Sequence, residues 1–114
     1  MRDERLYLDD VVSAADAVER FLSGVTLEAF LASDLLQSAV LQKLTIVGEA
    51  SARLSRDFRD RHPEIPWARA VSFRNFAVHA YFAVNWTTVW KTATEALPPF
   101  RAQVATLLEG EDLP

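Results

Sequence analysis

The sequence predicts an all-α protein, an up-and-down bundle of four main helices and one short helix. Apolar residues recur every three or four positions through most of the chain, which is the spacing of amphipathic helices. No stretch shows the strict apolar–polar alternation of a half-buried strand. With 114 residues, half of them hydrophobic and a quarter charged, the chain is long enough to bury a core, and we expect one domain over residues 1–114.

The first helix is predicted to end near Ser23-Gly24, because glycine suits a helix C-terminus. Aspartate and glutamate residues separate its apolar positions, which are Leu8, Val11, Val12, Ala15, Val18 and Leu22. After this helix, Thr26 can cap a short helical turn that extends through Leu31. The N-terminal third of the chain is therefore predicted to hold one amphipathic helix and one short helix.

A long helix is predicted to begin at Asp34. Gln37 follows three residues later, which resembles a capping box, the reciprocal hydrogen-bond pattern of a helix N-terminus. The apolar stripe of this helix consists of Leu36, Val40, Leu44, Val47, Leu54 and Phe58. Gly48 interrupts the helix at a cost of about 1 kcal/mol relative to alanine, and we interpret it as a point of close packing against a neighbouring helix. The helix should end before His62-Pro63, because the residue before a proline is pushed out of the helical region.

The segment Pro63-Glu64-Ile65-Pro66 is predicted to connect this helix to the next one. The next helix can begin at the second proline of the connector or at Trp67, because proline is well suited to the first helical turn. This helix carries Arg74 and should run to about Val78 or Ala80.

Asn85 is a suitable N-cap for the last helix. The apolar stripe of this helix consists of Trp86, Val89, Trp90, Ala93, Leu97, Phe100, Val104 and Leu107. Pro98-Pro99 falls inside the stripe and should kink or briefly break the helix, because proline has no amide hydrogen and its ring crowds the preceding turn. Residues 110–114 are expected to form a frayed tail.

The composition limits the possible functions. The chain has no cysteine, which excludes disulfides and thiolate metal sites. No apolar run approaches the roughly 20 residues that span a bilayer, and the first five residues lack the apolar core of a signal peptide, so we expect a cytoplasmic protein without a membrane partner. The net charge of -4 argues against broad, non-specific nucleic-acid binding. Residues 53–74 depart from this average, since they hold six arginines against three acidic residues.

The residues from Arg74 to Tyr81 gather the groups that phosphate chemistry needs. Arg74 offers a planar fork of donors that stays charged and matches phosphate oxygens. His79 can act as a general base or acid near neutral pH. If His79 deprotonates the 2′-hydroxyl of RNA while Arg74 stabilises the developing charge, transesterification gives a 2′,3′-cyclic phosphate. This chemistry needs no metal and no cofactor, and His62 and His79 stand in no recognised metal-ligand spacing.

Helix geometry restricts how Arg74 and His79 can meet. Residues five apart on an ideal helix point roughly 140° away from each other. Either the helix ends between them and the chain turns His79 inward, or a second copy of the chain completes the site. A symmetric homodimer that joins two such helix ends would bring paired arginines and histidines into one cleft. If the helix continues, Arg74 and Tyr81 fall on the same side of it.

The spacing Arg74-Asn75-x-x-x-His79-x-Tyr81 resembles the R-x4-H-x-Y signature of HEPN-domain proteins. More narrowly, the chain is similar to the small toxins of the HepT type, formerly a domain of unknown function, whose partner is an MNT-type minimal nucleotidyltransferase antitoxin. The order of motifs is also similar to that of the family, namely Val47-Gly48-Glu49-Ala50, then His62-Pro63-Glu64-Ile65-Pro66-Trp67, then the signature with Phe82, then Trp90.

This resemblance implies an all-α homodimer with the signature at its interface and a metal-independent ribonuclease activity. It implies that Arg74 and His79 are the catalytic pair, with Asn75 in a supporting hydrogen-bond role. It also implies that Tyr81 is the tyrosine that the antitoxin modifies with AMP, which silences the toxin, because a bulky charged adduct would block the cleft and repel RNA. Where the family often has an aspartate a few residues after the tyrosine, this chain has Asn85, which keeps the capping side chain and lacks the negative charge.

Two alternatives to a toxin ribonuclease stay open on the sequence. In the first, the signature belongs to a non-catalytic dimeric subunit that docks a minimal nucleotidyltransferase, which the acidic net charge favours. In the second, the protein is a plain helical dimer in which Arg74 and His79 are buried against carboxylates, with no open cleft between the subunits. Toxicity that is lost with His79→Ala separates the ribonuclease from the first alternative, and the surroundings of Arg74 bear on the second.

Overall fold

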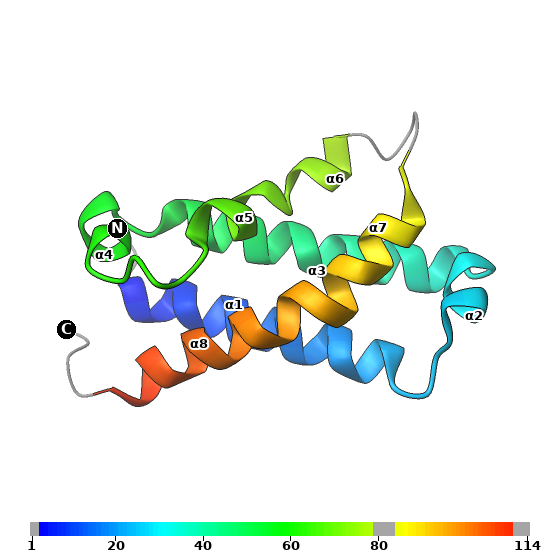
Figure 1. Ribbon diagram of the computed structural model, residues 1–114, viewed down its shortest axis with the longest axis horizontal. Coiled ribbons are helices and arrows are strands. Elements are labelled where there is room, and N and C mark those ends of the chain that lie inside the picture. Colours follow the sequence, from blue (N-terminus) through cyan, green and yellow to red (C-terminus); the bar gives the residue numbers. More distant parts are fainter. Residues whose placement is uncertain (1–2, 79–83, 111–114) are drawn as a thin grey trace.

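The structure of the chain is a computed structural model that describes residues 3–78 and 84–110. All regular secondary structure in these two ranges is helical, as predicted (Figure 1). The elements are α1 (Glu4–Leu22), α2 (Leu27–Leu31), α3 (Asp34–Arg53), α4 (Arg56–Asp60), α5 (Trp67–Ser72), α6 (Asn75–Val78), α7 (Trp86–Lys91), the π-helical turn η1 (Thr92–Ala96) and α8 (Leu97–Glu109). Of the predicted tail, only Gly110 is described, and residues 111–114 lie outside the described ranges.

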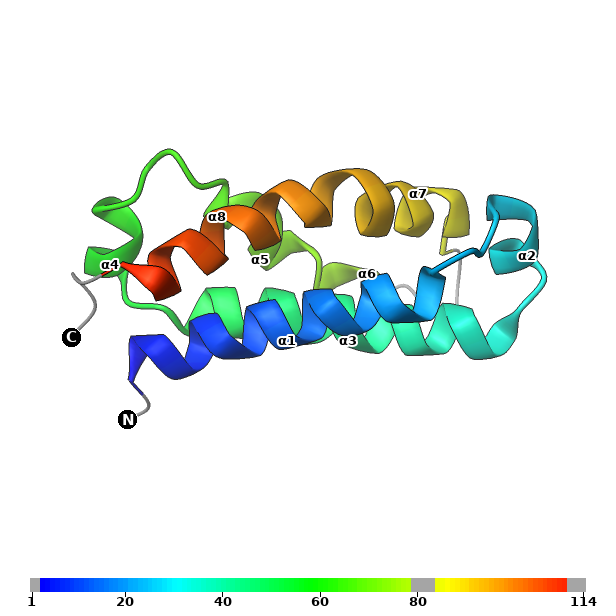
Figure 2. The same cartoon turned by 90° about the horizontal axis from the view of Figure 1, so that it is seen from below.

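Four helical runs form the bundle (Figure 1, Figure 2). α1 and α3 lie side by side and antiparallel, α8 packs on α1, and α5 and α6 lie along α3. α7, η1 and α8 follow one another without interruption and make the fourth run. This arrangement confirms the predicted all-α bundle, with α2 and α4 as short helices between longer ones. None of the helices in the described ranges is long and apolar enough to cross a membrane.

The core lies where the four runs meet. Its largest fully buried side chains come from segments far apart in the sequence and include Leu8, Phe30, Leu44, Phe58 and Leu97. Ring contacts add to this packing, since the Phe30 ring of α2 lies 6.3 Å from the Trp86 ring and 5.4 Å from the Trp90 ring, measured between centroids. Burial of apolar surface is the main favourable term in folding, so these contacts anchor the beginning of α7 on α2.

The N-terminus of α3 differs from the prediction. Ser33, and not Asp34, is the N-cap, and its Oγ accepts a hydrogen bond of 3.1 Å from a backbone N–H of the first turn. Gln37 does not complete a capping box. Its side chain is buried, and its amide donates to the carbonyl oxygens of Phe30 and Leu31 at 3.2 and 3.1 Å. The glutamine therefore supplies a donor to the carbonyl of Leu31 at the end of α2 and a second donor to that of Phe30, which also accepts the N–H of Ser33.

The long helix predicted to reach the residues before His62 is in fact two helices, α3 and α4. Leu54 takes an extended backbone conformation between them, with φ -62° and ψ 141°. Ser55 caps α4, and its own N–H donates to the carboxylate of Glu4, at the beginning of α1, over 3.2 Å. Leu54 and Phe58 are nevertheless both buried, which is why their apolar spacing predicted an unbroken helix.

The last run accommodates its prolines without a break. Asn85 caps α7 as predicted, and its side-chain oxygen accepts a first-turn N–H at 3.2 Å. Immediately before Pro98-Pro99, the N–H of Leu97 donates to the carbonyl of Thr92, five residues back. A proline cannot donate to the carbonyl four residues earlier, and its ring crowds that carbonyl. The wider π turn η1 relieves this conflict one turn upstream, and the run stays helical.

Ser33→Ala should lower the free energy of unfolding by about 1 kcal/mol, the usual cost of losing an N-cap side chain. Asp34→Ala, one residue later, is the matched control. It should lower the free energy of unfolding by only about 0.3 kcal/mol, because it removes an exposed charge near the helix N-terminus. Urea denaturation followed by circular dichroism measures both changes. Equal losses in the two variants would contradict the assignment of the cap to Ser33.

Candidate active site

Arg74 lies in a tight turn between α5 and α6. The single helix predicted from Pro66 or Trp67 to about Val78 or Ala80 is interrupted here and forms these two elements within the described residues. The N–H groups of Phe73 and Arg74 each donate to the carbonyl three residues back, at 3.1 and 3.3 Å. Bonds over three residues wind the chain more tightly than an α-helix, so the arginine is presented at a local irregularity and not in the middle of a regular helix.

Gly48 of α3 lies directly against this turn. A Cβ atom at position 48 would lie 2.6 Å from the backbone nitrogen of Arg74, 2.9 Å from its Cβ and 3.0 Å from the carbonyl oxygen of Val71. At such distances the surrounding backbone would have to shift, so only glycine fits here. The prediction that Gly48 marks close packing is confirmed, and its packing partner is the backbone that carries the arginine.

The guanidinium group of Arg74 pairs with Glu49, the residue after the glycine. Nη1 of Arg74 lies 3.7 Å from Oε2 of Glu49, and the two side chains are 42% and 50% exposed. This distance is too long for a hydrogen bond, and within the described ranges the Arg74 side chain donates none. An exposed ion pair contributes about 0.2–1 kcal/mol, so a phosphate group that accepts two donors of the fork can displace the carboxylate.

Buried aromatic side chains hold the other side of this turn. Phe73, directly before the arginine, is 4% exposed, and Trp67 at the beginning of α5 is 6% exposed. The Trp67 ring packs edge-on against Phe100 of α8 with 5.7 Å between centroids, and its Nε1 donates to the carbonyl of His62 at 3.0 Å. The turn is therefore fixed by α3 on one side and by the aromatic core on the other.

Of the other predicted site residues, Asn75 lies within the described ranges and His79 and Tyr81 lie outside them. Asn75 begins α6 and is exposed, and its side chain makes no hydrogen bond with another described residue, so its supporting role stays a prediction. His79 and Tyr81 lie outside the described residues, and their roles also stay predictions. On both sides of that segment the chain is anchored, since Phe76 and Val84 pack against the core.

Sequence reasoning missed Glu49 as the partner of Arg74. The two residues are far apart along the chain and belong to different elements, so helical spacing cannot connect them. The available signal was Gly48, because a glycine inside a helical pattern marks a place where another backbone comes close. A residue next to such a glycine lies at the edge of the contact, where a long side chain can reach across it.

The family model described as "Ribonuclease HepT-like" matches residues 12–107, a range that includes Gly48, Glu49 and the signature. The chain belongs to the HepT-like ribonuclease family. The match spans every helix from α2 to α7 and most of α1 and α8. The likeness therefore extends over the whole bundle and is not limited to the short signature.

Curated relatives of this HepT-like protein are similar over nearly their full length. A protein of Thermococcus cleftensis named "Probable ribonuclease HepT" is 37% identical over 102 residues, which cover 90% of this chain and 93% of its own. Two further relatives carry RNase in their names. One, from Methanocaldococcus jannaschii, is 32% identical, and the alignment covers 90% of this chain and 94% of the relative. The other, from Caldanaerobacter subterraneus, is 30% identical, and the alignment covers 97% of this chain and 99% of the relative. No solved structure matches the chain.

The surroundings of Arg74 in this HepT-like protein bear on the plain-dimer alternative. That alternative requires an arginine that is buried against an acid. The acidic partner is present in Glu49, but about half of each side chain is exposed. The guanidinium group is therefore accessible to a ligand, and the part of the alternative that concerns His79 lies outside the described residues.

Gly48→Ala should displace the turn that carries Arg74. Overpacking of a tight site costs about 1–3 kcal/mol, which exceeds the roughly 1 kcal/mol that alanine gains in helix propensity, so the free energy of unfolding should fall. Chemical denaturation measures the change. Gly110→Ala at the end of α8 is the matched control, because its added Cβ would come no closer than 3.3 Å to a neighbouring atom, the carbonyl oxygen of Leu107. A Gly48→Ala protein as stable as the wild type would show that α3 tolerates a side chain here.

Proposed function

We propose that this HepT-like protein is a metal-independent endoribonuclease and the toxin of a toxin–antitoxin pair. The observation that carries the proposal is the state of Arg74, whose backbone is packed against Gly48 while its guanidinium group stays half exposed beside one exchangeable carboxylate. A fixed backbone under an accessible cation suits phosphate chemistry, because a preorganised charge stabilises a transition state without reorganising first. The family match and the RNase names of the relatives support the same activity.

In the proposed reaction, His79 removes the proton from the 2′-hydroxyl of a ribose. O2′ then attacks the adjacent phosphorus, and the bond from phosphorus to the 5′-oxygen breaks. A protonated imidazole returns a proton to that oxygen, which leaves a 2′,3′-cyclic phosphate on one product and a 5′-hydroxyl on the other. Arg74 binds the non-bridging oxygens, where negative charge grows in the transition state. Atoms and charges balance, because the proton removed from the 2′-hydroxyl is matched by the proton given to the 5′-oxygen.

The site is proposed to lie in a symmetric homodimer. Among the described residues, α6 has its main contacts with α3, and a second copy is proposed to pack on its other side. Two copies would supply two arginines and two imidazoles, so that one imidazole acts as the base while the other acts as the acid. This arrangement also removes the difficulty that residues five apart on a helix point in different directions.

Tyr81 is the proposed control point of the same site. It follows His79 by two positions in the sequence. A nucleotidyltransferase antitoxin would transfer AMP from ATP to the phenolic oxygen and release pyrophosphate. The new phosphodiester would place a negative charge and a bulky group where the RNA phosphate should bind, and both would oppose RNA binding. Toxin, antitoxin and RNA would meet in the cytoplasm.

The wild-type protein should cleave RNA in the presence of EDTA and leave cyclic phosphate ends. His79→Ala should lower the cleavage rate by about 10²–10⁴-fold, the usual contribution of general acid–base catalysis, and should abolish growth arrest on expression. His62→Ala, which removes the other histidine of the chain, is the matched control and should still cleave. Electrophoresis of end-labelled RNA and analysis of the product ends measure these outcomes.

Full cleavage by His79→Ala would refute the ribonuclease assignment, and growth arrest that does not depend on His79 would favour the docking subunit. A mixture of the inactive Arg74→Ala and His79→Ala proteins tests the two-copy site within the same assay. Subunit exchange creates dimers in which one chain supplies the arginine and the other the histidine, so part of the activity should return. No recovery, together with a monomer in sedimentation, would contradict the shared site.

Co-expression with the nucleotidyltransferase should add the mass of one AMP group to Tyr81 and suppress RNA cleavage. Tyr81→Phe should stay unmodified and escape this suppression, because it has no phenolic oxygen to accept the group. Tyr7→Phe removes the other tyrosine and is the matched control, which should be modified as fully as the wild type. Peptide mass spectrometry measures the modification. If the antitoxin silenced Tyr81→Phe as well as the wild type, inhibition would occur by binding and not by modification.

A further inference from the structure

Charge is distributed unevenly over this acidic chain. Residues 53–74 hold six of its twelve lysines and arginines but only three of its sixteen acidic residues. The rest of the chain therefore holds six basic residues against thirteen acidic ones. Apart from Arg74, the arginines of this segment take no part in the proposed catalysis, so their concentration here needs a separate explanation.

Four of these arginines lie on α4, at its end or on α5. α4 closes one end of the bundle, and α5 leads from there along α3 to the turn at Arg74 (Figure 1). Arg56 and Arg59 line an open surface hollow between α4 and α5. Arg61, at the end of α4, and Arg69, on α5, are both exposed. Arg56, Arg59, Arg61 and Arg69 are called the arginine surface below.

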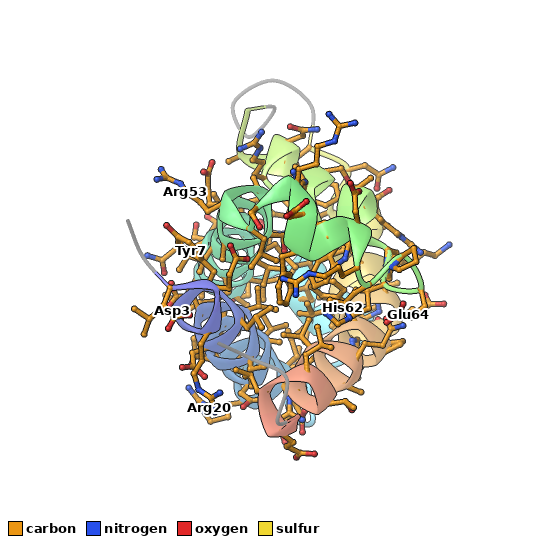
Figure 3. The ribbon with its side chains drawn as sticks, turned by 90° about the vertical axis from the view of Figure 1, so that its left-hand side faces the viewer. Asp3, Tyr7, Arg20, Arg53, His62 and Glu64 are labelled. Carbon is orange, nitrogen blue, oxygen red and sulfur yellow. The ribbon has the colours of Figure 1, made fainter. Side chains whose placement is uncertain are left out.

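The acidic helix α1 begins beside α4, since Glu4 accepts the N–H of Ser55, and runs from there along α3. Figure 3 views the molecule from the α4 end, with the connector residues His62 and Glu64 on one side and Asp3, at the beginning of α1, on the other. Residues 3–22, which form α1 and its cap, contain six acidic residues and two arginines. A polyanion should therefore be attracted to the arginine surface and repelled from α1.

The four arginines share residues 56–69 with three exposed acidic residues, Asp57, Asp60 and Glu64, so this segment has an excess of one positive charge. The Arg56 and Asp60 side chains are 92% and 72% exposed and 3.9 Å apart, so solvent screens their attraction. Among the described residues, no carboxylate lies within ion-pair distance of Arg59 or Arg69. Arg61 lies over a buried phenylalanine ring of its own helix, 5.7 Å from the ring centre, and this contact leaves its charge uncompensated.

The aromatic side chains nearby are not available for stacking on bases. Trp67 and Phe58 are only 6% and 1% exposed, because both belong to the core. The surface therefore offers charge without a stacking platform, which suits phosphate groups and carries no base preference. Its ligand should be a chain of repeated phosphates, since Arg59 and Arg69 have no ion-pair partner among the described residues and Arg69 lies on α5, the helix that precedes Arg74.

We propose that the arginine surface binds the RNA backbone on one side of the scissile phosphate and leads it to Arg74. α5 has six residues, or about 9 Å at 1.5 Å per residue, so Arg69 lies within a few nucleotides of the cleavage point. Recognition by this surface is electrostatic, independent of base sequence and sensitive to salt. The inference rests on the proposed function, because it takes RNA as the substrate of the site.

The test is RNA binding by the full chain carrying His79→Ala, so that binding is measured without cleavage. The probe is a fluorescein-labelled oligouridine of about 12 nucleotides, followed by fluorescence anisotropy over a range of salt concentrations. The pair Arg59→Gln and Arg69→Gln removes two charges and spares the ring contact of Arg61. If each arginine binds one phosphate, the plot of log association constant against log salt concentration should become less steep by about 1.4. The affinity at about 0.1 M salt should fall roughly 25-fold.

Two control proteins separate charge from folding. The pair Arg20→Gln and Lys91→Gln removes two exposed charges from α1 and α7 and should leave the salt slope unchanged. The pair Arg59→Lys and Arg69→Lys keeps both charges and should bind RNA like the parent protein. Normal binding by this lysine pair shows that the loss in the glutamine pair comes from missing charge.

The outcomes distinguish this inference from the proposed function. If the protein with Arg59→Gln and Arg69→Gln (the glutamine pair) has the same RNA affinity and salt slope as the parent, the proposed role of the arginine surface is wrong, even if the wild type cleaves RNA. Arginine-dependent RNA binding by a wild-type protein that cleaves no RNA would support the surface and contradict the ribonuclease. A glutamine pair that loses affinity for polyglutamate but not for RNA would identify a docking surface for an acidic protein, and would overturn the proposal.

Discussion

The backbone of Arg74 packs directly against Gly48, and the geometry of the candidate site follows from this contact. A hydrogen atom in place of a side chain lets α3 approach the turn between α5 and α6 to a distance that excludes even a methyl group. The same approach brings Glu49 within reach of the guanidinium group. Since close-packed interiors resist small changes in volume, the position of the arginine is set by packing, and the ion pair only adjusts its side chain.

The site combines firm packing with weak electrostatics. Trp67, Phe73 and Phe100 are almost completely buried beside the turn, whereas the pair of Arg74 and Glu49 is exposed and therefore contributes little to stability. This division suits a cation that has to exchange a carboxylate for a phosphate. Charge is also distributed unevenly along the chain, because α1 with its cap holds six acidic residues and two arginines, whereas residues 53–74 hold six arginines and three acidic residues.

Apolar periodicity placed the helical runs well, because it reports which positions are buried. It failed at helix ends, where the decisive partners are distant. Ser33 and Asp34 are both good caps by residue type, and the structure uses Ser33 while the side chain of Gln37 serves the carbonyls of α2. The break after α3 involves Glu4, near the N-terminus of the chain, whose carboxylate accepts the N–H of Ser55.

Residue order alone was enough to predict the all-α class, the HEPN-type signature and the special character of Gly48. It also identified Arg74 as a phosphate-binding candidate, because that chemistry belongs to the residue type. The contact between Gly48 and Arg74 and the pairing with Glu49 became known only from the folded chain. These features are distances between segments that are remote in the sequence. The spacing of residues along one helix carries no information about such distances.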